Sequence, residues 1–551
     1  MRFLARHIDV LTLLILFCAA QSGVAGQSKS LNPGQSATVT GTVTLKGRPA
    51  GGITVGVQPT QPTSVPQIFK SRTDQDGTYR VTGMPPGTYQ VSAALPGYVI
   101  AGNSTRGTMV VLATSETVNG IDFTLVRGGV ITGKVTDADG KPVIEEPVLL
   151  TDADPSANRR QFYPWLRIST DDRGIYRIFG IPTGRYKVFV GRSDVGFSPG
   201  MSVRTAYKQT YHPDVSDPAK ATVIEVNEGT EASDVNITVA RPSPTFTITG
   251  RVVDGETNNP IPKVQLGIQL VGERRFSYVS GSSSSNAQGE FRIEGLRPGK
   301  YGVFMAPEGD SNLRADTVHV EIVDQDITGV VIKTSKGATV TGTIALENPD
   351  DKVARSKLAN VEVQFYVQSK EQPSSFSRVR TAPINADGTF SVTGLESGLA
   401  TVALCRPGGE EVKGLKIARI IRDGIPQLRG LEIKAGEGIT DVQLIASYGT
   451  ASVHGTVRLT KGALAQSPRL FVQITKLADF PIGVETPYVD SRGQFLVEGL
   501  STGAYIFTFY TPGESGTFQP RLKQQVNVVD GSTNEVTFTI DLDAPPVSKE
   551  P

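Results

Sequence analysis

The sequence predicts an all-β protein, in which a signal peptide is followed by a tandem array of five antiparallel β-sandwich modules. Three observations favour this fold class. One turn-and-hairpin unit occurs five times, apolar and polar residues alternate along the segments around it, and no segment has the convincing period of an amphipathic helix. The 59 glycines and 35 prolines among 551 residues also indicate many turns between short strands.

The repeated unit starts with an acidic or amide residue three positions before a glycine, as in DQDGTYRVTGMPPGTYQV at 74–91. An aromatic residue stands two positions after this glycine. Two further glycines then bound a short connection, and a tyrosine follows it in every copy but the fourth, which has Ala400. We expect the Asx side chain to cap the turn by accepting backbone hydrogen bonds, with the first glycine supplying a positive φ. The marker glycines are Gly77, Gly174, Gly289, Gly388 and Gly493.

A strand with a glycine on its apolar face precedes each unit, and a shorter alternating strand closes each repeat. The first copies of these strands are ATVTGTVTL (37–45) and IDFTLV (121–126). Such a glycine indicates close approach by another group, which we expect to be an aromatic ring of the turn unit. Each repeat therefore predicts a sandwich of about 90 to 115 residues. The strand glycines are Gly41, Gly133, Gly250, Gly342 and Gly455.

The repeats predict the domain organisation. A chain of 551 residues is too long for one core, so several domains of ordinary size are expected. We predict a signal peptide at 1–26, a linker at 27–36, sandwiches at 37–127, 128–243, 244–335, 336–446 and 447–543, and a polar tail at 544–551.

The N-terminus has the pattern of a secretory signal. Arg2 and Arg6 precede the apolar run at 10–20, which is too short to span a bilayer comfortably. Cleavage after Ala20 or after Gly26 fits the small residues that follow. We therefore expect an exported chain, located in the periplasm, at the cell surface or outside the cell.

An uncleaved membrane anchor and a lipoprotein signal are less favoured roles for this N-terminus. The apolar run is short for an anchor. A lipoprotein signal would use Cys18, and it is weakened because Phe17 stands where those signals have a small residue.

The mature chain would contain one cysteine, Cys405, and so could form no intrachain disulfide. This fits bacterial export of domains that are held by their own cores. We expect Cys405 to be a buried strand residue. The net charge of +1 gives no reason to expect nucleic-acid binding. The tail APPVSKEP (544–551) is polar, so no transmembrane segment is expected in the mature chain.

Together, the strand with its inward glycine, the Asx turn and the Gly-x-Tyr hairpin resemble the carboxypeptidase regulatory-like domains. The stretch TYHPDVSDPAKATVIEV (210–226) is similar to a segment of tandem versions from exported bacterial proteins, and the resemblance is best over 37–335. It implies a transthyretin-like β-sandwich and a non-enzymatic accessory or binding module. The wider fold superfamily includes carbohydrate-binding domains.

Patterns typical of catalytic and metal sites are weak. The four histidines lie far apart, and none stands at metal-ligand spacing to another histidine or cysteine; His454 is expected on an outward face. The segment GFSPG (196–200) resembles a nucleophile elbow, but Pro199 has no N–H for an oxyanion hole. The acidic turns have too few carboxylates for calcium. We predict no catalytic residue, no metal and no cofactor.

Lys134 and Asn236 could form a covalent cross-link like that of the collagen-adhesin B-type domains, which have a similar fold. Against this, the alternation around Lys134 predicts that its side chain faces solvent.

The insertion QFYPWLR (161–167) contains the only tryptophan of the chain. Tyr163 and Trp165, beside arginines, could form a stacking platform for a sugar ring, and we predict them as carbohydrate-binding residues. The simpler possibility, that the rings cover the sandwich's own core, stays open.

The sequence therefore predicts a non-catalytic exported scaffold or adhesion protein, with weak carbohydrate binding as the sharper form and a polysaccharide or a protein of the cell envelope as partner. The alternative is an accessory module of an exported hydrolase, or an enzyme with an unrecognised site.

Overall fold

The computed structural model describes residues 36–60, 67–102, 107–153, 168–191, 207–241, 244–270, 277–305, 312–368, 378–462, 470–477, 486–512, 518–529 and 531–546. Over these residues the strands form ten sheets. The sheets pack in pairs around separate cores, which confirms the all-β sandwich fold class. We number these sandwiches 1 to 5 in chain order; the exact domain boundaries stay a prediction.

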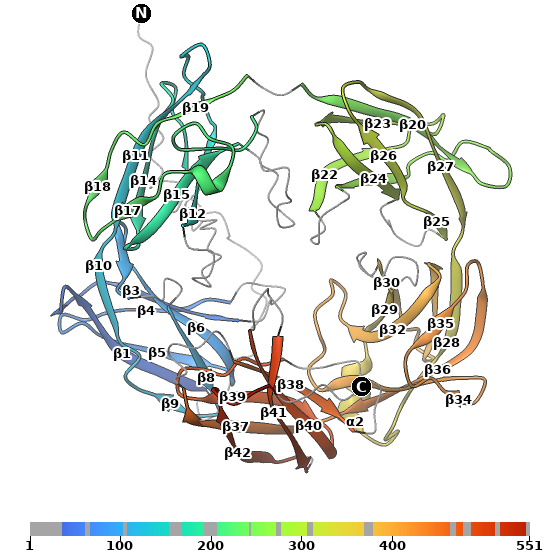
Figure 1. The fold of residues 1–551 in the computed structure, drawn as a ribbon. Coiled ribbons are helices and arrows are strands. Elements are labelled where there is room, and N and C mark those ends of the chain that lie inside the picture. The colour runs from blue at the N-terminus through green and yellow to red at the C-terminus, as the bar shows by residue number, and fades with distance from the viewer. Residues whose placement is uncertain are drawn as a thin grey trace, which may run out of the picture.

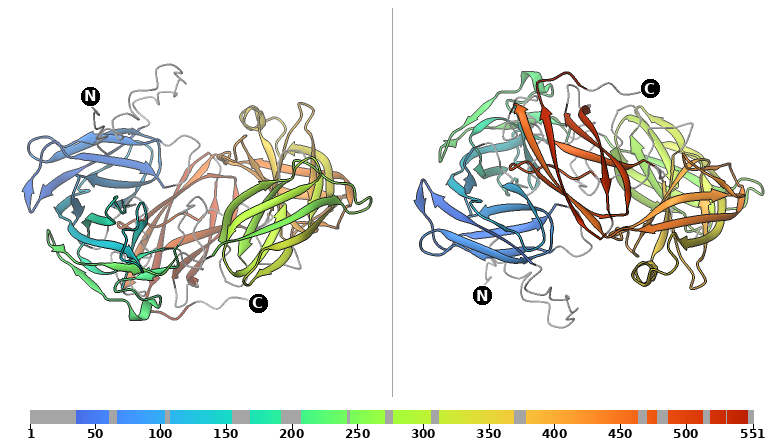
Figure 2. Two further views of the ribbon diagram at one scale, coloured as in Figure 1. Left: turned by 90° about the horizontal axis from the view of Figure 1, so that it is seen from above. Right: turned by 90° about the horizontal axis from the view of Figure 1, so that it is seen from below.

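The sandwiches follow one another around a closed ring, in which sandwich 5 lies beside sandwich 1 (Figure 1). The views from above and below agree, because both place sandwich 5 between sandwich 1 and sandwich 4 (Figure 2). Within the described ranges, no helix is long and apolar enough to cross a membrane.

Sandwich 1 shows the plan that the others share. Its first strand is central, between the antiparallel strand of the turn unit and a closing strand that runs parallel to it. The first sheet contains β1 (Ala37–Leu45), β2 (Arg48–Pro49), β5 (Thr78–Met84), β7 (Tyr98–Ile100), β9 (Thr117–Val118) and β10 (Phe123–Arg127). The second contains β3 (Thr54–Pro59), β4 (Phe69–Arg72), β6 (Gly87–Ala94) and β8 (Thr108–Leu112), in the order β4-β3-β6-β8.

Sandwiches 2 and 3 repeat this plan. Sandwich 2 contains β11 (Gly129–Asp137), β14 (Ile175–Ile181), β18 (Glu231–Ala232) and β19 (Ile237–Val239) in one sheet, and β12 (Pro147–Asp152), β13 (Ile168–Ser169), β15 (Gly184–Val190), β16 (Thr210–Tyr211) and β17 (Ile224–Val226) in the other. Sandwich 3 contains β20 (Phe246–Asp254), β23 (Glu290–Leu296), β25 (Leu313–Ala315) and β27 (Ile327–Lys336), packed on β21 (Gln265–Leu270), β22 (Ser277–Ser284), β24 (Gly299–Met305) and β26 (Val318–Ile322).

Sandwiches 4 and 5 complete the chain. Sandwich 4 contains β28 (Ala338–Leu346), β31 (Thr389–Leu395), β33 (Leu415–Arg422), β34 (Ile425–Pro426) and β36 (Gly438–Tyr448), packed on β29 (Glu362–Gln368), β30 (Arg378–Pro383), β32 (Gly398–Cys405) and β35 (Leu431–Ile433). Sandwich 5 contains β37 (Ala451–Lys461), β39 (Gln494–Leu500) and β42 (Thr533–Asp541), packed on β38 (Phe471–Lys476), β40 (Gly503–Pro512) and β41 (Phe518–Val528).

The strand pairing differs from the sequence prediction in one respect. Most pairs are antiparallel, but the first strand of every sandwich pairs in parallel with the closing strand, as β37 does with β42. Parallel neighbours need a long crossover connection, and here the chain passes through the second sheet between them. The alternation of residue types could not show this, because it is the same for both directions.

Helix is scarce in the described part of the chain. The helix α2 (Lys352–Leu358) begins after Asp351, whose carboxylate accepts hydrogen bonds from the N–H groups of Val353 and Ala354. The short 3-10 turn at Pro218–Lys220 is capped by Asp217, whose side chain accepts the Ala219 N–H at 2.9 Å.

The cores form as the alternation predicts. In β5 the side chains of Tyr79, Val81 and Met84 are buried, while those between them are exposed. The apolar residue that follows the second glycine of the turn unit is buried in every copy, and burying each one contributes roughly 1.5–3 kcal/mol. These residues are Met84, Ile181, Leu296, Leu395 and Leu500.

Candidate functional site

The Asx residue of the repeated turn binds its own backbone. In sandwich 2, Asp171 Oδ1 accepts hydrogen bonds from the N–H groups of Ile175 at 2.7 Å and Arg173 at 3.0 Å. The first of these bonds is the main reason why the pKa of Asp171 lies below its usual value. Asp74 and Asn286 make the same bond to the N–H four residues later. The predicted capping role is confirmed in these copies.

The fourth copy caps its turn differently. Asp387 Oδ1 accepts the N–H and the hydroxyl of Thr389, and these bonds lower the pKa of Asp387. Asn385, at the expected position, instead donates from Nδ2 to the Thr389 hydroxyl at 2.9 Å. A carboxylate two residues further on therefore takes the role that the sequence assigns to Asn385.

The aromatic residue of the turn unit completes the core. The buried Tyr176 hydroxyl donates a hydrogen bond to the Val235 carbonyl at 2.5 Å, and burial raises the pKa of Tyr176. Tyr79 binds the Ile121 carbonyl in the same way at 2.6 Å.

The inward glycine of the first strand leaves room for a neighbouring group, but this group is not mainly the aromatic ring that the sequence predicts. A Cβ on Gly133 would lie 2.0 Å from the Val235 carbonyl oxygen and 2.7 Å from the Tyr176 hydroxyl. A backbone carbonyl is thus the nearest group, with the ring second. Only in sandwich 5, at Gly455, is an aromatic ring the nearest group, with Phe495 Cε1 at 2.1 Å. The expectation of a ring was incomplete, because the path of a distant backbone segment has no local signal.

The tyrosine of the hairpin binds back to its own turn. Tyr89 donates to the Pro85 carbonyl at 2.8 Å, and burial, with a smaller effect of the Glu498 carboxylate of sandwich 5, raises the pKa of Tyr89 to about 12. The other hairpin tyrosines bond to the carbonyl four residues earlier in the same way. They are Tyr186, Tyr301 and Tyr505.

The predicted sugar-binding residues Tyr163 and Trp165 lie outside the described residues, as does GFSPG at 196–200. Their assignment stays a prediction. Elsewhere, exposed rings gather on sandwich 5, which the sequence analysis missed. The Phe471 ring stacks on the Tyr510 ring, with the ring centroids 5.3 Å apart, and meets the Phe518 ring edge-on at a centroid distance of 4.9 Å. The Tyr488 ring also lies edge-on to Phe471, at a centroid distance of 6.3 Å. Phe518 and Tyr488 are 53% and 38% exposed. We call these four residues the aromatic group.

The remaining candidates have structural roles. Cys405 is buried, and burial raises the pKa of its thiol, which confirms the predicted strand cysteine. His454 Nδ1 lies 3.2 Å from Glu535 Oε1. The His454 side chain is only 16% exposed, less than expected, while that of Glu535 is 66% exposed. Among the described residues, no group of three or more His, Cys, Asp and Glu side chains is placed to hold a metal ion.

The Lys134 side chain is exposed, as expected. Asn236 Oδ1 accepts the backbone N–H of Lys134 at 2.9 Å, so the Asn side chain caps the first strand. Asp122 binds the Thr42 N–H in the same way in sandwich 1.

Specific contacts join neighbouring sandwiches. Arg297 of sandwich 3 donates to the Tyr207 carbonyl of sandwich 2 at 2.7 Å. Asn312 Oδ1 accepts the Gly394 N–H of sandwich 4 at 3.2 Å. Lys413 Nζ lies 2.5 Å from Glu498 Oε2, which joins sandwiches 4 and 5. These bonds, with short connections, fix the path of the ring.

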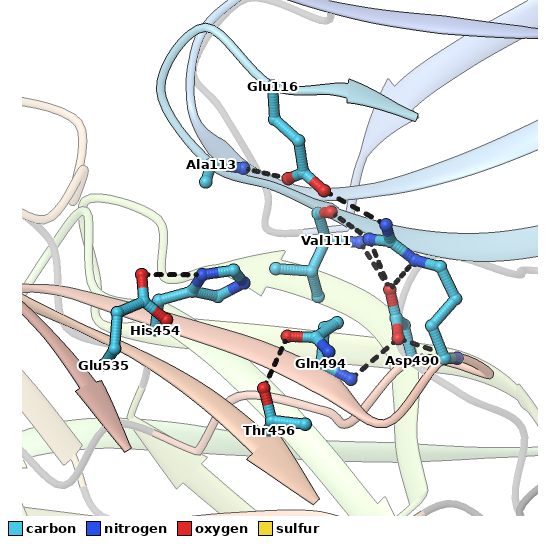
Figure 3. Close-up of polar contacts among 9 residues, drawn as sticks. Val111, Ala113, Glu116, His454, Thr456, Asp490, Gln494 and Glu535 are labelled. Carbon is cyan, nitrogen blue, oxygen red and sulfur yellow. Dashed lines mark hydrogen bonds and ion pairs between the residues drawn. The ribbon is translucent and has the colours of Figure 1, made fainter. Parts of the chain in front are cut away.

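The ring closes where the fifth turn meets sandwich 1 (Figure 3). Asp490 Oδ1 caps its own turn by accepting the Gln494 N–H at 2.8 Å, while Oδ2 accepts the Val111 N–H at 3.1 Å. Arg492 donates to the Val111 carbonyl at 2.6 Å and to Glu116 at 3.1 Å. Sequence reasoning assigned Asp490 only a turn cap and gave no role to Arg492.

Comparison with known proteins supports the family resemblance. A search of curated proteins found no match. Among solved structures, a streptococcal ancillary pilin is 14% identical, with 55% of this chain and 99% of that chain covered and a TM-score of 0.25. Two B repeat units of the collagen-binding protein of Staphylococcus aureus are 14% identical, with 75% and 98% covered and a TM-score of 0.15. Residues 38–126 match the family model of the carboxypeptidase regulatory-like domain. Sandwich 1 is therefore similar to the carboxypeptidase regulatory-like domains.

Proposed function

We propose that the chain is a non-catalytic exported scaffold or adhesion protein, whose sandwiches hold partner molecules of the cell envelope. One observation carries this proposal: the polar side chains that recur in the repeated unit bind the protein's own backbone. Asp171 caps its turn, Tyr176 binds the Val235 carbonyl, and Tyr186 binds the Pro182 carbonyl. The repeat thus multiplies a stable framework, which suits a protein that presents several surfaces at fixed spacing.

The proposed location rests on the N-terminal sequence. Arg2 and Arg6, the apolar run at 10–20 and the small residues after it have the order of a secretory signal. The chain would act in the periplasm, at the cell surface or outside the cell.

In its more specific form, the proposal is that the partner molecule is a carbohydrate. Tyr163 and Trp165 would offer a sugar ring an aromatic plane beside arginine donors, and the aromatic group of sandwich 5 adds partly exposed rings elsewhere on the chain. One stacked ring contributes about 1–3 kcal/mol, by analogy with bases stacked on aromatic side chains. Single sites would therefore be weak, and retention would depend on several sites acting together.

The alternative is that the chain is an accessory module of an exported hydrolase, or an enzyme with an unrecognised site. Its signature would be turnover of an ester, peptide or glycoside that one substitution abolishes.

A glycan array with cell-envelope polysaccharides tests the carbohydrate form. We expect Trp165→Ala to lose most of the wild-type retention, and Phe518→Ala to lose any share that depends on the aromatic group. Phe179→Ala is the matched control, because Phe179 is a 48% exposed ring on β14 of the same sandwich as Trp165. If no glycan is retained, or if Trp165→Ala and Phe179→Ala bind alike, Trp165 is not a sugar site.

A further inference from the structure

The contact between the two ends of the ring is built on an edge strand. Strand β8 lies at the end of its sheet, so one side of its backbone has no neighbouring strand. On that side, Val111 gives its N–H to Asp490 Oδ2 and accepts a hydrogen bond from Arg492 Nη2. The fifth turn therefore satisfies both polar groups of one edge residue, as another strand would.

Charge reinforces this contact. The Arg492 guanidinium lies between the Asp490 carboxylate at 2.9 Å and the Glu116 carboxylate at 3.1 Å. Glu116 is itself held by the Ala113 N–H at 2.7 Å. Hydrogen bonds between ionised groups are stronger than those between neutral groups. The charged groups of Asp490, Arg492 and Glu116 therefore each have a partner, either in the other sandwich or in their own turn.

The second turn of the chain provides an internal comparison. Residues 171–174 read DDRG and residues 490–493 read DSRG, so both turns carry an aspartate and an arginine at the same positions. The side chains of Asp171 and Arg173 are 40% and 73% exposed. The Asp490 side chain is fully buried. Docking on sandwich 1, and not the local turn, therefore buries the Asp490 carboxylate.

We propose that sandwiches 1 and 5 are a matched head-to-tail pair, and that Asp490 and Arg492 form a clasp that holds the chain closed on itself. The occupant of the β8 edge is the chain's own fifth turn. The contacts at the other junctions bring the two ends together, so docking within one chain has a high effective concentration that a second copy lacks. The ring in Figure 1 is the result.

Closure has two consequences. It covers an edge strand that would otherwise be open to pairing with other chains. It also fixes where the surfaces of all the sandwiches lie relative to one another. The same two surfaces on separate chains would join head to tail without closing, which gives open filaments. Opening the clasp therefore converts a closed monomer into a chain that can extend or assemble.

Distance measurement between spin labels tests the clasp. Labels are placed at the exposed positions Arg80 of β5 and Arg458 of β37, in a Cys405→Ser background. The mature wild-type chain is expected to be a monomer with one narrow distance distribution. Arg492→Ala and Asp490→Asn are expected to lose the narrow peak. Arg173→Ala and Asp171→Asn, the matched changes in the second turn, are expected to keep it.

The same variants also show whether a lost distance peak reflects an open clasp or a chain that has failed to fold. Asn286 already occupies the Asp490 position in the third turn and caps it by the same bond, so Asp490→Asn should keep the turn and the circular dichroism spectrum of the wild type. A broad distribution in the wild type, or a narrow one in both clasp variants, overturns the proposal. So does a wild-type oligomer whose distance peak disappears on dilution with unlabelled chain, because the occupant would then be a second copy.

Discussion

The Tyr176 hydroxyl lies 2.5 Å from the Val235 carbonyl oxygen, and Gly133 leaves room for both groups. Three segments of sandwich 2 meet at this point: the first strand, the turn unit and the chain before the closing strand. In sandwiches 3 to 5 a phenylalanine ring lies against the corresponding glycine, so the glycine and the aromatic residue recur together.

Tyr176→Phe tests the hydrogen bond. The change removes the hydroxyl and leaves the Val235 carbonyl without this donor, which should lower the stability of sandwich 2 by about 1 kcal/mol. The ring itself should still fit, because Phe291, Phe390 and Phe495 occupy the same position in later copies. Hydrogen exchange of the sandwich 2 amides gives the measurement, and exchange at the wild-type rate would contradict the assigned role.

Gly41→Ala tests the close approach. A Cβ at Gly41 would lie 2.1 Å from the Ile121 carbonyl oxygen, so we expect a loss of about 1–3 kcal/mol from overpacking. Gly56→Ala in β3 of the same sandwich is the control, because nothing lies within 4 Å of its Cβ position. Urea unfolding of both variants decides the point, and equal effects of the two substitutions would show that the close approach does not matter.

Asp171 gives a prediction for pH. Its pKa is lowered in the folded state, so its contribution to stability is present above the ordinary value of 3.8 and is lost as the pH falls through the folded pKa. Sandwich 2 should therefore lose this contribution to its stability as the pH falls below about 4. Asp171→Asn should make this loss shallower while keeping the turn, since Asn286 caps in the same way. Asp171→Ala should destabilise at neutral pH. An unchanged pH profile in Asp171→Asn would contradict the prediction.

The sequence predicts most of what is local. An Asx residue, a glycine of positive φ and alternating apolar residues act within a few positions of one another, so the turn at 74–77, its cap and the buried Tyr79 could all be predicted from it. The matched family model over 38–126 agrees with these predictions.

What the sequence misses is set by partners far along the chain. The Val235 carbonyl is 59 residues from Tyr176, and the parallel closing strands need the path of a whole sandwich. Asp490 and Asp171 start nearly identical turns, yet only Asp490 docks on sandwich 1, because the accumulated geometry of the junctions decides which turn meets β8. Burial, not residue type, distinguishes the two turns.

The most direct test of the central claim asks whether the chain binds envelope material and leaves it unchanged. The purified mature chain is incubated with labelled oligosaccharides and peptides from cell envelopes, and mass spectrometry measures both what is retained and what is altered. A non-catalytic scaffold predicts that at least one class is retained and released intact. Products that form with the wild type and disappear after a single substitution would contradict the account.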